Sequence, residues 1–225
     1  MVDRTKWFDK GYYEDGNIKT NTENSFERNF ELAKNHILNL KNLLANKKYR
    51  ILEIGCAYGH VQNELMNNGY INSYGVDISE YAINKGKEKL IKIKDKIFVK
   101  NIEDDDFAEF IKEKTGHDNF DFIISWCCLE HILDNKVKTV IKNMHLILDK
   151  DGFMLHMIDS FKGDDITHYS IHDKKWWIDK FSDNGFLYIQ PPINNINIYG
   201  FVKEDLRTKS IMAYIGAFFE VKNNG

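Results

Sequence analysis

The stretch EIGCAYGH carries the clearest chemical signal in the sequence. An apolar run, RILEI, leads into Gly55, Ala57 and Gly59, which are spaced two residues apart, and the acid Glu53 stands two residues before the first glycine. A glycine-rich turn after a buried strand is typical of nucleotide binding, because backbone N–H groups can approach the ligand closely there. The sequence therefore predicts a nucleotide or nucleoside ligand at this turn.

The spacing of the turn narrows the choice of ligand. A dinucleotide-binding fingerprint would have its third glycine three residues after the second, where this chain has His60. A Walker-type loop would continue with Gly-Lys-Ser/Thr, which is absent here. The expected ligand carries no pyrophosphate, and a nicotinamide cofactor is the alternative.

The pattern Glu-x-Gly-x-Ala-x-Gly resembles the first motif of the class I S-adenosylmethionine-dependent methyltransferases, and the resemblance extends over about residues 28 to 190. It implies that Asp77, at the end of YGVDIS, holds both ribose hydroxyls of the cofactor. The other interpretation of Asp77 is a helix cap, because Ser79 and Glu80 begin the next expected helix.

Later motifs follow in the family's order. Asn101 and Ile102 end the third expected strand at the adenine-contacting position, where the family commonly has Asp; an Asn carbonyl oxygen can also accept from the adenine amino group. The fourth strand, FDFIISWCCLEHI, lacks the Pro-Pro-aromatic element of adenine and glutamine amide methylases, which disfavours methylation of a base amine. The residues implied to frame the cofactor are Glu53, Gly55, Cys56, Ala57, Gly59, Asp77, Ile78, Asn101, Ile102, Trp126, Cys127 and Tyr13.

Histidines are the candidate bases. Methyl transfer from a sulfonium is an in-line displacement, so a base is needed only where the acceptor loses a proton. His168 is the first candidate, oriented by Asp165, because methyltransferases that modify sugars often carry a similar Asp-x-Thr-His segment. His131, after the fourth strand, is the second; for these residues and His172 the alternative is an ordinary loop histidine. His156 lies between apolar residues and is expected to be structural.

No metal site is expected from the sequence. A recognisable zinc site would show two histidines closely spaced on a helix with a third ligand, and no such pattern is visible.

The N-terminal residues 1–25 are rich in aromatic side chains, which indicates an entry segment or lid that packs on the domain. Tyr12 or Tyr13 could meet the sulfonium through a cation–π interaction, and Trp7 and Phe8 are further candidates for a lid. The alternative is simple docking of these aromatic rings onto the domain.

The elements that must position these residues belong to one expected domain, residues 26–225. A helix begins behind Ser25, and from residue 50 short apolar runs alternate with helical periods, which predicts crossover units and a parallel sheet. FLYIQPP and SIMAYIGAFFEV resemble two closing strands separated by about 18 irregular residues. The family resemblance implies an α/β fold, a Rossmann-like three-layer sandwich with a seven-stranded, mostly parallel sheet whose last strand is antiparallel.

Composition limits the partners. The chain has 225 residues, 43% of them hydrophobic, enough for one sizeable core, and its net charge of -3 gives no general attraction to nucleic acid. No apolar run reaches the roughly 18 residues of a membrane helix, and no signal peptide is visible. The 3 cysteines are too few and too clustered for a disulfide framework, which favours a cytoplasmic location.

Together these features predict a cytoplasmic S-adenosylmethionine-dependent methyltransferase acting on a small molecule, with a sugar-like oxygen as the preferred acceptor. The alternatives are N-methylation of an amino-sugar or secondary metabolite, a nicotinamide-dependent oxidoreductase, a catalytically silent cofactor-binding subunit and an RNA methyltransferase. No nucleic-acid or membrane partner is expected, and a homodimer is left open.

Overall fold

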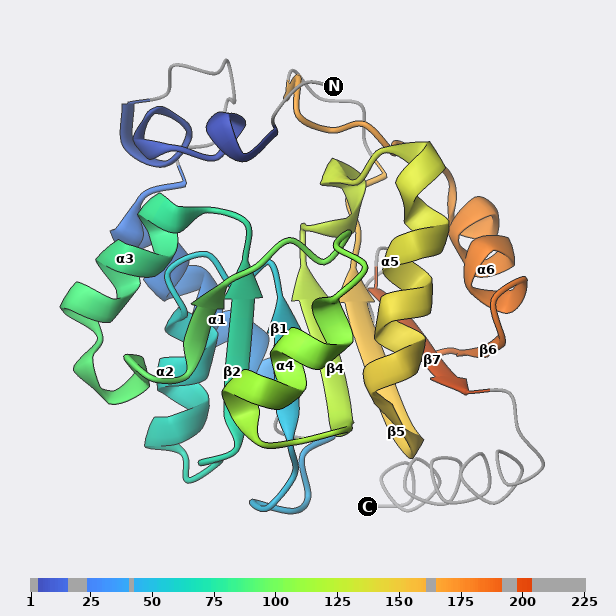
Figure 1. The fold of residues 1–225 in the computed structure, drawn as a ribbon, viewed down its shortest axis with the longest axis horizontal. Coiled ribbons are helices and arrows are strands. Elements are labelled where there is room, and N and C mark those ends of the chain that lie inside the picture. The colour runs from blue at the N-terminus through green and yellow to red at the C-terminus, as the bar shows by residue number, and fades with distance from the viewer. Residues whose placement is uncertain (1–3, 16–23, 41–42, 161–164, 192–197, 204–225) are drawn as a thin grey trace, which may run out of the picture.

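The computed structural model describes residues 4–15, 24–40, 43–160, 165–191 and 198–203, and in Figure 1 helices lie on both sides of one sheet. The strands are β1 (Ile51–Ile54), β2 (Ser73–Asp77), β3 (Ile97–Val99), β4 (Phe120–Trp126), β5 (Leu148–Met157), β6 (Phe186–Ile189) and β7 (Ile198–Lys203). The α-helices are α1 (Phe26–Leu40), α2 (His60–Asn67), α3 (Glu80–Lys89), α4 (Phe107–Thr115), α5 (Asp134–Ile147) and α6 (Lys174–Ser182). Short helical turns are η1 (Arg4–Trp7), η2 (Gly11–Asp15), η3 (Ile91–Ile93) and η4 (Leu129–His131).

The sheet has the strand order β3-β2-β1-β4-β5-β7-β6. Strands β1 to β5 pair in parallel, whereas β7 runs antiparallel between β5 and β6. The seven-stranded, mostly parallel sheet with an antiparallel last strand is therefore confirmed. The order reverses at β1, which has β2 on one side and β4 on the other, and ligands of such sheets bind beyond the carboxyl ends of the strands at this point.

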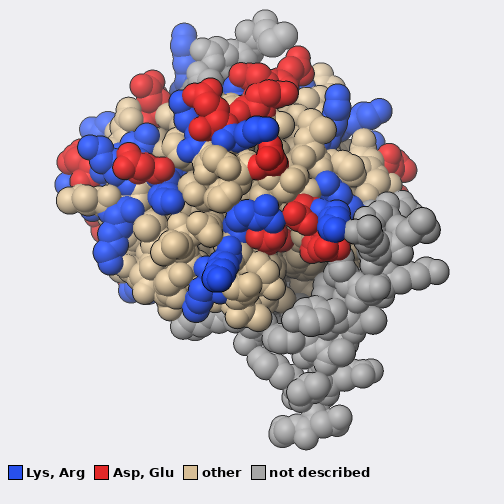
Figure 2. Space-filling view, turned by 60° about the horizontal axis from the view of Figure 1, so that its bottom comes forward, with Lys and Arg blue, Asp and Glu red and all other residues tan. Residues whose placement is uncertain are grey.

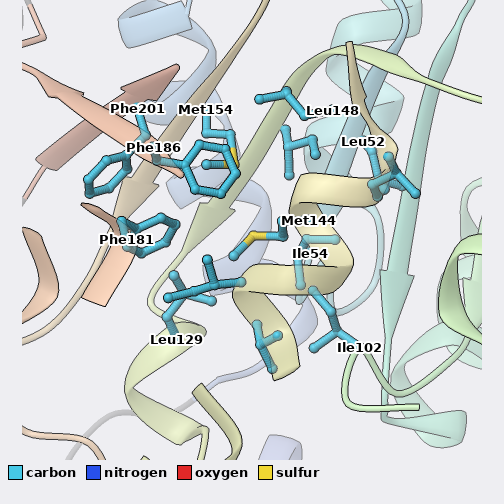
Figure 3. Packing of buried hydrophobic residues seen from close by; sticks show 14 of the residues in the cluster. Leu52, Ile54, Ile102, Leu129, Met144, Leu148, Met154, Phe181, Phe186 and Phe201 are labelled. Atoms are coloured by element: carbon cyan, nitrogen blue, oxygen red, sulfur yellow. The ribbon is translucent and has the colours of Figure 1, made fainter. Parts of the chain in front are cut away.

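Two apolar layers hold the helices to the sheet. On the face covered by α4, α5 and α6, Met144 packs among Leu52, Ile54 and Leu148, and a group of aromatic rings, Phe181, Phe186 and Phe201, continues the layer toward β6 and β7 (Figure 3). On the opposite face the buried residues of α1 and α2 pack on the central strands; they include Ala33, Ile37, Leu40, Val61, Leu65, Ile124 and Leu155. The long apolar strands are thus buried on both faces, as a parallel sheet requires.

The carboxyl ends of the central strands point toward the N-terminal segment 4–15, which lies beyond that edge of the sheet in Figure 1. β1 ends at Ile54, β2 at Asp77 and β4 at Trp126. The loops that follow these strands therefore meet at one edge of the sheet.

The position of the final strand differs from the sequence-based expectation. β7 is Ile198–Lys203, inside the stretch expected to be irregular, and residues 210–221 lie outside the described part of the chain. A Cβ on Gly200 would come 2.7 Å from the carbonyl oxygen of Ile189, so glycine is needed for this close pairing with β6. Sequence analysis did not identify β7 because a glycine inside a strand normally weakens it.

Gly86 lets α3 pack closely against the glycine turn. A Cβ there would lie 2.1 Å from the carbonyl oxygen of Tyr58. We expect Gly86→Ala to lower the free energy of unfolding by about 2–3 kcal/mol through overpacking, although alanine is the better helix former. Urea unfolding measures this, with Asn84→Ala on the exposed side of the same helix as the control. Equal stability of Gly86→Ala and wild type would show that the contact is not tight.

No helix in the described ranges is both long enough and apolar enough to cross a bilayer. On the face seen in Figure 2, Lys and Arg side chains alternate with Asp and Glu over the surface that is not grey. This face has no extended basic patch of the kind that binds a phosphate backbone.

Candidate functional site

The glycine turn between β1 and α2 has a left-handed backbone at alternate residues. Gly55, Ala57 and Gly59 have φ angles of 73°, 47° and 79°. A Cβ on Gly55 would lie 2.5 Å from Sγ of Cys128, so this position has no room for a side chain. Ala57 carries its methyl group in a conformation that favours glycine, so the turn is strained there. The spacing of small residues in the sequence thus reflects the backbone of this turn.

Asp77 ties the turn to the end of β2. Its Oδ2 accepts a hydrogen bond of 2.8 Å from the backbone N–H of Ala57, and its Oδ1 accepts one of 2.8 Å from Ser79. The helix cap is Ser79, whose Oγ accepts from the N–H of Ala82. A carboxylate has about four lone-pair sites. The N–H of Ile78 also bonds to this carboxylate, so Asp77 keeps acceptor capacity for a ligand hydroxyl in addition to its structural bonds.

Burial controls the charge of the two acids in this region. Burial raises the pKa of Asp77 to about 6, an effect that its backbone hydrogen bonds partly offset. Burial also raises the pKa of Glu53 to about 8, while a hydrogen bond of 2.7 Å from Nε2 of Gln62 opposes the shift. Gln62 on α2 was not singled out in the sequence, and it fixes the Glu53 side chain in place.

A cavity of about 610 Å³ opens where the loops after β1, β2, β3, β4 and β5 meet. It is lined by Tyr13, Glu53, Gly55, Cys56, Ala57, Asp77, Ile78, Asn101, Ile102, Trp126, Cys127, His131, Asp165 and His168. Of the residues implied to frame the cofactor, only Gly59 is not in this lining. A Cβ on Gly59 would lie 2.5 Å from Cδ1 of Ile93, so its smallness serves packing beneath the turn.

The loop after β3 is held by a residue that sequence analysis missed. Nδ2 of Asn143, on α5, donates 2.6 Å and 2.9 Å hydrogen bonds to the carbonyl oxygens of Ile102 and Asp104. Oδ1 of Asn101 accepts a 3.0 Å hydrogen bond from the N–H of Glu103. The loop after β3 is thereby fixed, with Asn101 and Ile102 both in the cavity wall.

Helix α1 forms a wall of the cavity that sequence analysis did not identify. The His36 ring stacks on Trp126 with centroids 4.2 Å apart and an angle of 5°. Burial lowers the pKa of His36 to about 4, so the ring is neutral at pH 7. Arg28 and Asn29 also line the cavity. His36 lies among the core positions of an amphipathic helix, and its sequence pattern gives no sign that it reaches a ligand cavity.

The N-terminal aromatic residues pack over the same cavity. Phe8, Tyr12 and Tyr13 line it, whereas Trp7 does not. The Phe8 and Tyr12 rings are 5.0 Å apart, and the Phe8 ring lies 5.5 Å from His131. The segment therefore docks on the domain at the cavity, and its role as a lid over a ligand stays a prediction.

A polar cluster joins the loops after β4 and β5. Nδ1 of His131 lies 3.1 Å from the carbonyl oxygen of Thr167 and 2.9 Å from its Oγ1, which donates a hydrogen bond of 2.6 Å to Oδ1 of Asp165. Nε2 of His168 lies 3.6 Å from Oδ2 of Asp165, and the rings of His131 and His168 are 4.7 Å apart. The structure therefore brings both candidate histidines and Asp165 together.

Glu130 completes this cluster, and its burial could not be read from the sequence. Its side chain is fully buried, and Oε1 accepts a hydrogen bond of 3.2 Å from the N–H of Asp159. Burial raises the pKa of Glu130 to about 8. Burial is the main cause that lowers the pKa of His131 to about 4, and the neighbouring His168 is the second cause. His131 is therefore neutral near pH 7.

The other two histidines that were weighed lie outside the cavity. His156 is fully buried in β5, with Nδ1 2.8 Å from Oγ of Ser125. His172 lies 2.9 Å from Asp134 and stacks on Trp176. These contacts agree with a structural role for His156 and a local one for His172.

His156 is expected to make the fold acid-sensitive. Burial lowers its pKa to about 3, against 6.5 for a solvated histidine, so between these values the unfolded chain binds a proton that the folded chain does not. The stability that His156 contributes above pH 6.5 is lost as the pH falls. Between pH 7 and pH 5 we expect wild type to lose about 2 kcal/mol more than His156→Gln. Urea unfolding at both pH values tests this, and parallel losses in the two proteins would contradict it.

The fold and this cavity define a class: a Rossmann-like α/β protein with a ligand cavity at the switch point of its sheet. A family model described as a methyltransferase domain matches residues 26–191. A search of curated proteins finds no match.

Solved structures share the fold at low sequence identity. The magnesium protoporphyrin IX methyltransferase of Synechocystis PCC 6803 with bound SAM has a TM-score of 0.61 and 14% identity, over 90% of this chain and 98% of that one. A TehB-like SAM-dependent methyltransferase of Corynebacterium glutamicum has a TM-score of 0.55 and 15% identity, over 79% and 99% of the two chains. A putative S-adenosylmethionine-dependent methyltransferase of Listeria monocytogenes has a TM-score of 0.56 and 15% identity, over 78% and 100%.

These likenesses show the fold, and the family model shows the family. The chain belongs to the methyltransferase domain family, and it is an S-adenosylmethionine-dependent methyltransferase.

Proposed function

We propose that this enzyme transfers the methyl group of S-adenosylmethionine to a hydroxyl oxygen of a small, sugar-like acceptor. The observation that carries the proposal is the composition of a single cavity. Gly55, Asp77 and Asn101 lie at the carboxyl ends of β1, β2 and β3, and the loops after β4 and β5 supply His131 and His168. A cofactor over the first set would lie next to an acceptor over the second.

The first set of residues fits the cofactor. Asp77 lies in the cavity wall, where its carboxylate can accept from ribose hydroxyls, and the left-handed turn at Gly55 lies in the same wall. Asn101 and Ile102 supply an amide and an apolar side chain for the adenine, while Tyr13 supplies an aromatic ring for the sulfonium. S-adenosylmethionine provides the activated methyl group, and these residues bind and orient it.

The second set of residues fits a hydroxyl acceptor. A hydroxyl must lose its proton as it is methylated, and His168, with Asp165 3.6 Å away, offers an imidazole nitrogen to receive it. Nδ1 of His168 is buried and makes no hydrogen bond to another described residue. The segment Asp165-Ile166-Thr167-His168 also resembles segments in sugar-modifying methyltransferases.

The cavity size supports a small acceptor. About 610 Å³ must hold both the cofactor and the acceptor, within the usual range of about 300–1,000 Å³ for ligand pockets. The net charge of -3, together with the mixed charges on the face shown in Figure 2, supports the absence of a nucleic-acid partner. The clustering of only 3 cysteines supports our further proposal that the enzyme acts in the cytoplasm.

An amine is the second candidate acceptor. Two further carboxyl groups, those of Asp159 and Asp165, line the cavity and would attract a cation such as an amino-sugar. An amine nitrogen attacks in its neutral form, so this reaction depends less on a base near His168.

The two candidates are separated by identifying the product. The enzyme is incubated with S-adenosylmethionine labelled with carbon-13 on the methyl group and with matched pairs of neutral sugars and amino-sugars. We expect the label at the chemical shift of an O-methyl ether. A product with the label on nitrogen only would contradict the proposal, and so would the absence of transfer to every hydroxyl acceptor under conditions where the cofactor is bound.

A further inference from the structure

Three potential metal ligands meet at the acceptor side of the cavity. Glu130, His131 and His168 each offer one ligand atom, and these three atoms lie within 4.8 Å of one another. All three residues line the cavity. A cation between them would therefore be in contact with whatever acceptor occupies it.

Two of these side chains carry buried atoms that lack a hydrogen-bond partner among the described residues. Glu130 is fully buried and uses only Oε1, while its Oε2 has no partner. Nδ1 of His168 is likewise buried and without a partner. Leaving a buried carboxyl oxygen without a hydrogen-bond partner is costly, and a bound cation would remove this cost.

The surroundings of His131 are those of a metal-bound imidazole. The carbonyl oxygen of Thr167 can only accept, so Nδ1 of His131 carries the proton and the lone pair is on Nε2. The hydroxyl of Thr167 donates to Asp165, so its oxygen also accepts from Nδ1. Histidine ligands usually donate their second N–H to a carbonyl or carboxylate in this way.

Asp165 is the corresponding acceptor group beside the ring of His168. Its Oδ2 lies 3.6 Å from Nε2 of His168, which favours the proton on Nε2 and leaves the lone pair on the unpartnered Nδ1. Both rings can therefore present a lone pair to the space beside Glu130.

The backbone holds the two loops in register. The carbonyl oxygen of Glu130 accepts hydrogen bonds of 2.9 Å from the N–H groups of both Tyr169 and Ser170. The segment that carries His168 is therefore anchored to the residue that supplies the carboxylate. A site with its ligands fixed in advance binds a cation with little reorganisation.

We propose that Glu130, His131 and His168 form a divalent-cation site at the acceptor end of the cavity. Two imidazoles with one carboxylate suit Mn²⁺, Fe²⁺, Co²⁺ or Zn²⁺ better than Mg²⁺ or Ca²⁺, which prefer oxygen ligands. Sequence analysis predicted no metal because it sought closely spaced histidines. The ligand set instead spans two loops that only the fold brings together.

The role of the cation rests on the proposed function. Three protein ligands leave positions open for acceptor oxygens, and binding to the cation would acidify an acceptor hydroxyl. Its proton would pass to solvent, the oxygen would form a bond to the methyl carbon, and the carbon–sulfur bond would break with its electron pair remaining on sulfur. In this form of the enzyme His168 holds the cation instead of accepting the proton.

The test begins with the metal alone. Full-length protein, first treated with EDTA and then desalted, is titrated with Mn²⁺, and free Mn²⁺ is counted by electron paramagnetic resonance. We expect one site per chain, weakened at least tenfold in both Glu130→Gln and His168→Ala. His172→Ala changes a histidine outside the cavity and is expected to bind as wild type does. Binding of S-adenosylhomocysteine by each variant serves as the check of folding.

Two results would overturn the metal site: no binding of Mn²⁺, Co²⁺ or Zn²⁺ by wild type at millimolar concentration, or unchanged Mn²⁺ binding in both Glu130→Gln and His168→Ala. Methyl transfer is measured separately with and without EDTA. Mn²⁺ binding at these residues without transfer to any hydroxyl would support the site and contradict the proposed function. If the protein binds no cation and EDTA leaves methyl transfer to a hydroxyl unchanged, the result would contradict the metal site and support the proposed function.

Discussion

Replacing Asp77 by alanine is expected to lower the affinity for S-adenosylhomocysteine by about a hundredfold or more. In the proposed site this carboxylate, which ends β2, accepts from ribose hydroxyls, and each hydrogen bond to a charged group is worth about 1.5–3 kcal/mol. Its loss also frees the N–H of Ala57, so the glycine turn loses an anchor on the cavity wall. Isothermal titration calorimetry well below the melting temperature measures the effect.

The control for Asp77→Ala must separate ligand binding from damage to the helix that follows. Ser79→Ala removes the cap of α3 but keeps the carboxylate, so it is expected to cost about 1 kcal/mol of stability and little affinity. Asp77→Asn keeps one oxygen acceptor and should lie between wild type and Asp77→Ala. Affinity of Asp77→Ala within threefold of wild type would remove Asp77 from the cofactor site.

Replacing His168 by alanine is expected to lower kcat by about 10²–10⁴-fold while the affinity for S-adenosylhomocysteine stays within threefold. Both roles considered for His168, proton acceptor and cation ligand, act on the acceptor and not on the adenosyl group. His168 belongs to the loop after β5, whereas Asp77 and the glycine turn follow β2 and β1. Single-turnover methyl transfer with the identified acceptor provides the rate.

His172→Ala is the matched control for the rate, because His172 lies in the same segment but contacts Asp134 and Trp176 outside the cavity. Loss of cofactor affinity in His168→Ala would mean that this residue belongs to the cofactor half of the cavity. An unchanged kcat would remove it from the chemistry altogether.

The glycine turn and its place in the cavity wall could be predicted from sequence because the turn is local. Gly55, Ala57 and Gly59 mark a turn whose left-handed φ angles select small residues, and that requirement leaves a short, readable pattern. Asp77 could be placed beside the glycine turn because it ends β2, which pairs in parallel with β1. The parallel sheet itself follows from alternating apolar runs and helical periods.

The rest of the site could not be predicted because it depends on tertiary packing. His36 has the sequence position of a core residue of α1, and only the fold stacks it on Trp126. Glu130 resembles an ordinary loop acid until its burial is known. Asn143 reaches the loop after β3 from another helix. None of these contacts leaves a local pattern in the sequence.

The most direct measurement is a pair of calorimetric titrations of the wild-type protein, one with S-adenosylhomocysteine and one with NAD⁺. S-adenosylhomocysteine is the product form of the cofactor, and NAD⁺ represents the dinucleotide that the spacing of the turn disfavours. We predict one S-adenosylhomocysteine bound per chain and no measurable binding of NAD⁺. Tighter binding of NAD⁺, or no binding of S-adenosylhomocysteine, would contradict the assignment of this cavity.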